Sequence, residues 1–389
     1  MEGHGMRKIP SLTGIEQIKA LAILGVVTVH MQAALFDRRP WVLLASRDLP
    51  NLWSHPDVMF PAHDSYFLSV LHFFTMLGAN APGVFLVVSG LTLTWSTLHT
   101  SGEKAWLRHY FMRRVLRIFP LYMAAHVLDL VASRLIPGQR IPLEFPQIIL
   151  SLFGLRFTYD TFLYLDPAWW FVWVILQLYC LFPILFWLLQ TVGISRFLTC
   201  TFVLTVMSRI WGIVAVEHLS SWDLGIICIT RLGEFTIGMA IARWLYDRKL
   251  DLSSVSPASI RVITGWALIV YLIGLAAQTT LMGTTVAPLF VSLGMTGVFW
   301  GICKLAILES KSTSHVLTWI GIHSYGIYLL HFLPFKWMVA INRGAPVAQI
   351  LSMLGVVAVA GLLTWFMERT LRQFTSLPRW SGLRPTPFT

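Results

Sequence analysis

Two basic side chains on the first apolar segment are spaced in a way that suits chemistry inside a membrane. Lys19 and His30 are 11 residues apart. In an α-helix that spacing is three turns plus about 20°, so both side chains project from one face with a rise of roughly 16 Å. A neutral imidazole at that depth can be the general base that takes a proton from a hydroxyl group. The alternative is a packing histidine whose polar atoms are satisfied by its neighbours.

Further ionisable residues fall at a similar depth on other apolar segments. Such side chains are costly in a bilayer, so they commonly mark functional sites. Asp129 is predicted to orient His30 by accepting its second N–H, which would fix one tautomer of a catalytic imidazole. The alternative is a set of salt bridges, Asp129 with Arg209 or Arg231 with Glu234. The polar layer predicted from depth comprises His30, Asp129, Arg209, Arg231, Glu234 and His331.

A basic cluster, Arg113, Arg114 and Arg117, lies at the start of the third apolar segment. Spacings of i,i+3 and i,i+4 place guanidinium groups together on a helix, where they can bind phosphates in a bidentate manner. Coenzyme A carries such phosphates and would reach this cluster from the cytoplasm. The alternative is a purely topological role, because Lys and Arg are enriched in cytoplasmic loops.

Membrane-spanning helices must position these residues. Of the 389 residues, 56% are hydrophobic and 12% are charged, and the mean hydropathy is +0.69. These values exclude a soluble protein. Residues 145–157 make only about half of a span and are predicted to be interfacial or re-entrant. Ten longer segments are predicted to cross the bilayer, near residues 14–36, 76–99, 115–136, 168–192, 197–216, 223–246, 260–281, 285–308, 316–338 and 346–368.

The predicted fold class is therefore an all-α polytopic membrane protein with about ten transmembrane helices. Cytoplasmic termini put most of the 29 Lys and Arg residues on the cytoplasmic side, as the positive-inside rule requires. Residues 1–375 are predicted to form one transmembrane domain, and residues 376–389 a short cytoplasmic tail. The first segment runs into Asp37, Arg38 and Arg39, which is typical of a retained signal anchor.

Charge and cysteine usage exclude several other classes. The formal net charge of +11 is spread over helix ends, so it fits membrane orientation and acidic lipid headgroups better than nucleic acid. The four cysteines lie in apolar segments without paired spacing. Neither a disulfide framework nor a zinc site is predicted, and no metal is expected.

Six stretches taken together resemble the acyltransferase-3 family of integral membrane O-acyltransferases. In order, they are residues 15–22 closed by His30, residues 83–90 ending in Ser-Gly, residues 113–122 with the pattern Arg-Arg-x-x-Arg-x-x-Pro-x-Tyr, residues 170–183, residues 321–331 with Tyr325 and His331, and Glu368-Arg369. They cover nearly the whole chain. Two departures are Lys19, where many relatives carry Arg, and Ile175-Leu176, where many carry a pair of Glu residues.

The resemblance implies transfer of an acyl group from cytoplasmic acyl-CoA, with acetyl-CoA as the expected donor, to a hydroxyl of an extracytoplasmic carbohydrate. A bacterial inner membrane is the expected location. His30 matches the family's catalytic histidine, and Lys19 and the three arginines match residues linked with the donor. Side chains expected to contact the acceptor are Trp170, Arg231, Glu234, Tyr325 and His331.

Two alternatives remain open from the residues alone. A multi-pass transporter of a polar or anionic solute also suits a helical bundle with a buried polar layer, although such proteins usually show internal repeats. A role for Trp169, Trp170 and Trp173 in stacking on sugar rings competes with a place in the interfacial aromatic belt.

Overall fold

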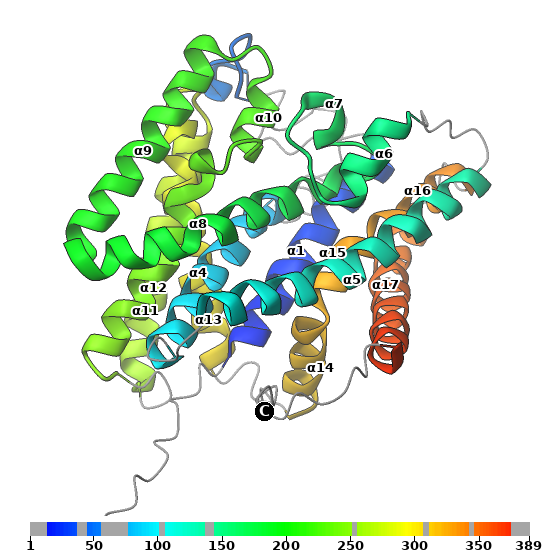
Figure 1. Cartoon of the computed structure of the whole chain (residues 1–389). Coiled ribbons are helices and arrows are strands. Elements are labelled where there is room, and N and C mark those ends of the chain that lie inside the picture. The colour runs from blue at the N-terminus through cyan, green and yellow to red at the C-terminus, as the bar shows by residue number, and fades with distance from the viewer. Residues whose placement is uncertain are drawn as a thin grey trace, which may run out of the picture.

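The computed structural model describes residues 14–36, 45–55, 77–100, 106–136, 144–250, 255–305, 311–341 and 346–374. In these ranges the chain forms helices and connecting turns (Figure 1), with one isolated β-bridge, between Asn51 and Thr280, and no strand. The predicted all-α fold is confirmed. The predicted tail, residues 376–389, and the residues Asp37, Arg38 and Arg39 lie outside the described ranges.

Short helices and 3₁₀ turns lie between some of the longer helices along the chain. The longer helices are α1 (Ile15–Phe36), α4 (Ala81–Thr100), α5 (Trp106–Leu135), α8 (Trp170–Val192), α9 (Ile194–Ala215), α11 (Leu232–Asp247), α12 (Pro257–Gln278), α13 (Ala287–Lys304), α14 (Lys311–Ile322) and α17 (Pro346–Phe374). The shorter ones are α6 (Phe145–Leu152), α7 (Tyr159–Phe162), α10 (Leu219–Leu224), α15 (Ser324–Leu330) and α16 (Phe332–Ile341). Single 3₁₀ turns are η2 (Leu52–Ser54), η3 (Leu77–Asn80), η4 (Pro167–Trp169), η5 (Cys228–Arg231) and η6 (Gly283–Thr285).

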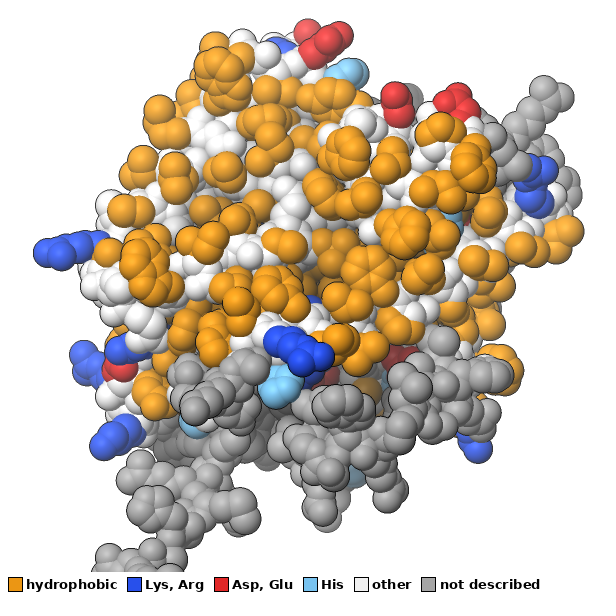
Figure 2. All heavy atoms as spheres, in the orientation of Figure 1, with side chains coloured by type: hydrophobic (Ala, Val, Ile, Leu, Met, Phe, Trp, Pro, Cys, Tyr) orange, Lys and Arg blue, Asp and Glu red, His pale blue; other side chains and the backbone are white. Residues whose placement is uncertain are grey.

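Several of these helices are suited to a bilayer. Within the described residues, 6 helices are long and apolar enough to cross a membrane, and 7 if one bent pair counts as a span. Hydrophobic side chains cover most of the face shown in Figure 2, and charged ones lie mainly toward its margins. A polytopic membrane protein is thereby confirmed, whereas the count of ten spans is not. With 8 residues, α6 is too short to cross about 30 Å of hydrocarbon, as predicted.

Close approach of two helix backbones holds the centre of the bundle together. A Cβ atom on Gly90 of α4 would lie 2.0 Å from the carbonyl oxygen of Phe235, and one on Gly238 of α11 would lie 1.9 Å from that of Val87. Only glycine fits at either position. Small residues allow such contact between membrane helices, where dispersion and weak hydrogen bonds replace the hydrophobic effect. The Ser-Gly stretch of α4 is therefore a packing motif.

The span predicted at residues 316–338 is not one continuous helix. The helical segments Thr313–Ile322 and Ser324–Trp337 meet at a bend of 64°, and a second junction at His331 separates α15 from α16. A broken helix is stable at membrane depth only where protein groups satisfy its backbone. Here the carbonyl of Tyr328 accepts from His331 Nδ1 at 2.7 Å, and the carbonyl of Leu329 accepts from Trp169 Nε1 at 3.0 Å. The break thus places His331 against the bundle interior.

Candidate active site

His30 on α1 and His331 at the junction of α15 and α16 form a hydrogen-bonded pair. His30 Nδ1 lies 2.7 Å from His331 Nε2, and the two ring planes differ by 16°. The rings of His30 and Phe332 pack edge to face, with 5.7 Å between ring centroids. His331 is fully buried and His30 is half-buried. Two histidines predicted to share a depth are therefore in direct contact.

The backbone determines which nitrogen of each ring carries the proton. A carbonyl oxygen only accepts, so His331 Nδ1, 2.7 Å from the oxygen of Tyr328, must be protonated. In a neutral ring its Nε2 is then the acceptor, and His30 Nδ1 donates to it. That leaves the lone pair of His30 on Nε2, which no described residue engages by a hydrogen bond. The relay fixes the tautomer required of a general base.

The same two helices lead from the histidine pair toward the basic cluster. Lys19 lies on α1 three helical turns before His30 and forms a salt bridge of 2.5 Å with Glu16. It is also close enough to Arg117 for the two positive charges to repel each other. Tyr325 is the second residue of α15, and its hydroxyl donates to the carbonyl of Ile118 on α5 at 3.2 Å. The structure therefore places the Tyr325 hydroxyl against α5, the helix that carries the three arginines.

The three arginines of α5 have different surroundings. Arg113 and Arg117 are exposed, and Arg113 Nε donates to the carbonyl of His109 at 3.2 Å. Arg114 instead packs over the rings of Tyr110 and Tyr179, at 5.8 and 5.6 Å from the ring centroids. Its Nε is buried without a hydrogen-bond partner among the described residues. Two of the three arginines, Arg113 and Arg117, are therefore exposed, whereas Arg114 packs against two tyrosine rings.

A second cluster unites three of the residues expected to contact the acceptor. Arg231 forms a salt bridge of 2.9 Å with Glu234, and its guanidinium lies 5.5 Å from the centroid of the Trp170 ring. Glu234 is completely buried, and its Oε1 also accepts from Ser292 Oγ at 3.0 Å. A Cβ on Gly83 would lie 1.9 Å from that Ser292 oxygen. The absence of a side chain on Gly83 of α4 therefore leaves room for this ion pair and for Ser292.

Comparison with known proteins now adds to the geometry. The chain matches the profile of an acyltransferase domain over residues 12–365. It belongs to the acyltransferase-3 family. No curated protein and no solved structure matches the chain. The enzyme is therefore a membrane-bound acyltransferase of groups other than aminoacyl groups, and the transporter alternative is set aside.

Asp129 does not orient the histidine of this acyltransferase. Its two carboxylate oxygens accept from Lys336 Nζ at 2.9 and 2.8 Å, and the same ammonium donates to the carbonyl of Leu165 at 3.1 Å. The expected contact with His30 is wrong, because the neighbouring helix supplies His331 at that position. The expected alternative of an Asp129 salt bridge with Arg209 is also wrong, whereas the Arg231 to Glu234 salt bridge is confirmed.

Arg209 has a partner other than the expected Asp129. It forms a salt bridge of 3.4 Å with Asp223 and donates from Nε to the carbonyl of Thr284 at 3.0 Å. The side chain is 5% exposed. Arg209 thus joins α9 to the turns around α10 and η6, which is a structural role.

Sequence reasoning missed Lys336 and Asp166. Lys336 was available as a charged residue within the apolar stretch of residues 332–341. Asp166 is 1% exposed, caps η4 by accepting from the N–H of Ala168 at 2.8 Å, and has an Oδ2 without a hydrogen-bond partner in the part of the chain that the structure describes. Burial, together with the nearby Asp129 carboxylate, raises the pKa of Asp166 to about 7. Two carboxyl groups thus share the field of one ammonium.

Proposed function

We propose that the enzyme transfers an acyl group, most simply acetyl, from cytoplasmic acyl-CoA to a hydroxyl group of an extracytoplasmic carbohydrate. The observation that supports this best is the relay from the Tyr328 carbonyl through His331 to His30, which leaves the lone pair of His30 on Nε2, where no described residue forms a hydrogen bond with it. A single bacterial inner-membrane domain, residues 1–375, is the form of the enzyme that we infer.

The reaction needs one proton acceptor beside the thioester. His30 Nε2 takes the proton of the acceptor hydroxyl while its oxygen attacks the thioester carbonyl carbon. The tetrahedral intermediate collapses with cleavage of the C–S bond, and the imidazolium of His30 returns the proton to the coenzyme A thiolate. A thioester is already activated, so the protein mainly orients the two reactants and moves this proton.

His331 replaces the carboxylate that often supports a catalytic histidine. When His30 becomes an imidazolium, the bond from its Nδ1 to His331 Nε2 turns into a charge-assisted hydrogen bond, which is stronger than the neutral one. A neutral acceptor adds no further charge to the membrane interior, where charged groups are expensive. His331 is thus a positioning residue that acts through His30.

Donor handling is assigned to the opposite end of α1. Lys19, Arg113 and Arg117 supply positive charge for the phosphates of coenzyme A. The pantetheine arm then extends along α1 toward His30, over the rise of roughly 16 Å that separates Lys19 from His30. Tyr325 lies along this route. On the acceptor side, Trp170, Arg231 and Glu234 are the residues assigned to the carbohydrate.

Sealed membrane vesicles test both the reaction and its direction. Inverted vesicles expose the predicted cytoplasmic surface to radiolabelled acetyl-CoA, and we expect base-labile label on a glycan in their lumen. Right-side-out vesicles exclude the donor from that surface and should give no label. Inverted vesicles that contain the His30→Ala variant are the matched control. Label that enters the lumen without any ester product would contradict the proposal and favour transport.

A further inference from the structure

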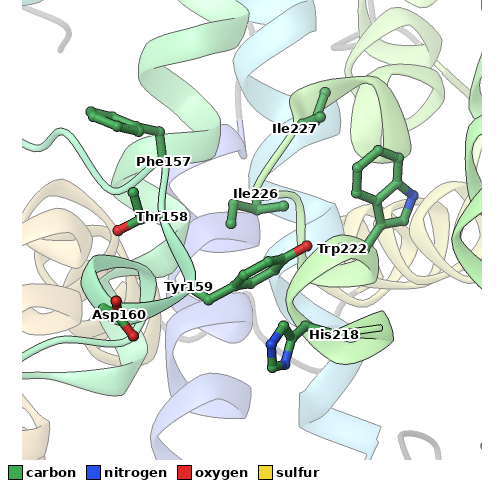
Figure 3. Close-up of a pocket in the computed structure, with 8 residues that line it drawn as sticks. All are labelled: Phe157, Thr158, Tyr159, Asp160, His218, Trp222, Ile226 and Ile227. Carbon is green, nitrogen blue, oxygen red and sulfur yellow. The ribbon is translucent and has the colours of Figure 1, made fainter. Parts of the chain in front are cut away.

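A pocket of about 470 Å³ opens at the end of the molecule away from the arginine cluster. It lies between α7 and α10, which meet at the top of Figure 1. The side chain of Tyr159 extends from one wall toward His218 and Trp222 on the other (Figure 3). The rings of Tyr159 and His218 are in contact, with centroids 4.2 Å apart. Its volume falls within the range of small-ligand sites, roughly 300–1,000 Å³.

A buried arginine holds one wall of this pocket in place. Arg156 is completely buried and donates from Nη1 to the carbonyls of Thr161, Phe162 and Tyr164 at 3.0–3.3 Å. Thr158 caps α7 through reciprocal bonds with Thr161. The turn that carries Tyr159 is thereby fixed before any ligand arrives. Such pre-organisation lowers the entropic cost of binding.

The opposite wall is fastened to α8. Trp173 Nε1 donates to the carbonyl of Ile226 at 2.8 Å, and Gln177 Oε1 accepts from the N–H of Cys228 at 3.0 Å. The ring of Trp173 also packs against Phe157 of the first wall, with centroids 6.3 Å apart. Trp173 and Gln177, which belong to the family stretch at residues 170–183, thus hold this wall of the pocket in place.

A short path of contacts joins the pocket to the histidine pair. The loop through Ile226 continues into η5 and ends at Arg231, whose guanidinium packs on Trp170. The next residue, Phe171, packs against Tyr328 with centroids 5.8 Å apart. Tyr328 supplies the carbonyl that holds His331. The pocket is therefore linked to the predicted catalytic residues through a series of packed side chains and is separate from them.

The residue types that line the pocket favour an uncharged ligand over an anionic one. Of the 8 lining residues, Asp160 carries a carboxylate and none is Lys or Arg. Asp160 and the hydroxyl of Tyr159 have no hydrogen-bond or ion-pair partner among the described residues. A phosphate headgroup or an acidic sugar would meet this carboxylate with no cation to offset it. Aromatic faces beside free polar groups suit an uncharged sugar ring, which has apolar C–H faces and a hydroxylated rim.

We propose that this pocket binds a neutral pyranose unit of the acceptor glycan, next to the unit that receives the acyl group. The inference rests on the proposed function, because it assigns a second binding position to the same acceptor. Tyr159 stacks on the sugar ring, and Asp160 accepts hydrogen bonds from its hydroxyls. Binding here raises the affinity for a glycan chain over a single sugar and leaves the acyl-transfer step unchanged.

Steady-state kinetics with natural oligosaccharides test this assignment. The probe is the mixture released by partial acid hydrolysis of the surface glycans of the producing cells, separated into neutral and anionic fractions. Release of coenzyme A is followed at saturating acetyl-CoA. We expect Tyr159→Ala and Asp160→Asn each to raise KM for the neutral fraction about tenfold, with kcat and the donor KM within about twofold of the parent. Tyr159→Phe keeps the ring and should restore most of the affinity.

Trp211→Ala is the matched control. Trp211 is an aromatic residue in the last turns of α9, the helix that precedes α10. Its side chain is 60% exposed and does not line the pocket. An equal rise of KM in this variant would show an interfacial-belt effect and overturn the pocket. An unchanged KM in both pocket variants, or preference of the parent for the anionic fraction, would also overturn it while the proposed function stands. Transfer by the parent to a non-carbohydrate hydroxyl only would overturn both.

Discussion

His30 Nδ1 and His331 Nε2 are 2.7 Å apart, although the two residues are separated by 301 positions in the chain. The contact makes each imidazole depend on the other: the Tyr328 carbonyl determines the tautomer of His331, and His331 determines that of His30. Only the far nitrogen of His30 is left to accept a proton. The predictions for His30 and His331 below depend on the direction of these two hydrogen bonds.

Replacement of His30 by alanine should abolish acyl transfer and leave the protein folded. General-base catalysis contributes about 10²–10⁴ in rate, so we expect at least that loss in coenzyme A release. The side chain is half-buried and makes its one described side-chain hydrogen bond to His331, so abundance in membranes should stay near normal. Glycan acylation and immunoblots measure the two quantities. Full activity of the variant would remove His30 from the mechanism.

Substitutions of His331 separate positioning from packing. His331→Ala removes the acceptor for His30 Nδ1, and we expect kcat to fall about 10–100-fold, as for other residues that orient a functional histidine. His331→Gln offers an amide oxygen to the same N–H and should recover part of that loss. His331→Leu fills the space without an acceptor and serves as the control. Equal rates for the glutamine and leucine variants would contradict the relay.

Arg117→Ala should weaken use of the donor more than use of the acceptor. Arg117 is exposed and interacts electrostatically with Lys19, so its loss removes charge where we place the phosphates. Charge-assisted bonds contribute roughly 1.5–3 kcal/mol, which corresponds to a rise of about tenfold or more in the donor KM. Arg261→Ala on α12 removes an equally exposed cation outside the cluster. A similar donor KM in both variants would point to a topological role.

Part of this site was predictable because it follows from local spacing. Arg231 and Glu234 are three residues apart, so one helical turn brings them together whatever the rest of the fold. The depth of His30 and His331 was likewise readable from hydropathy. Their contact was not, because which helices are neighbours depends on packing between segments far apart in the chain. That is why depth alone suggested Asp129 as the partner of His30.

The break in the predicted span at residues 316–338 was hidden for a related reason. Most of its residues are apolar, and hydropathy does not distinguish a straight helix from a bent one. The second junction, at His331, is stabilised by the bond from Trp169 to the Leu329 carbonyl, which is a tertiary contact, and by the bond from His331 to the Tyr328 carbonyl. Lys336 was overlooked because a lysine near the end of a span usually extends to the interface. Here it turns inward to Asp129.

The Asp129 and Lys336 pair should be structural, and a double substitution tests this. The two side chains are 2% and 7% exposed, so Asp129→Leu alone leaves an unpaired buried ammonium, at a cost of about 3–5 kcal/mol. We expect low abundance and a low melting temperature. Asp129→Leu with Lys336→Met removes both charges and should restore stability together with acyl transfer. A stable double variant that is inactive would make Asp129 a functional residue.

Asp166 should make the stability of the enzyme depend on pH near neutrality. Its pKa is raised to about 7, because the carboxyl group is buried beside the Asp129 carboxylate. Between pH 4 and 7, roughly, the folded protein keeps a proton that the unfolded chain releases, so stability falls as pH rises through this window. Asp166→Asn keeps an oxygen for the N–H of Ala168 but does not titrate. The variant should therefore gain melting temperature over the parent as pH rises from 5 to 8, measured by thermal shift in detergent. Parallel curves for the two proteins would mean that Asp166 ionises normally, and that Lys336 stabilises both carboxylates at once.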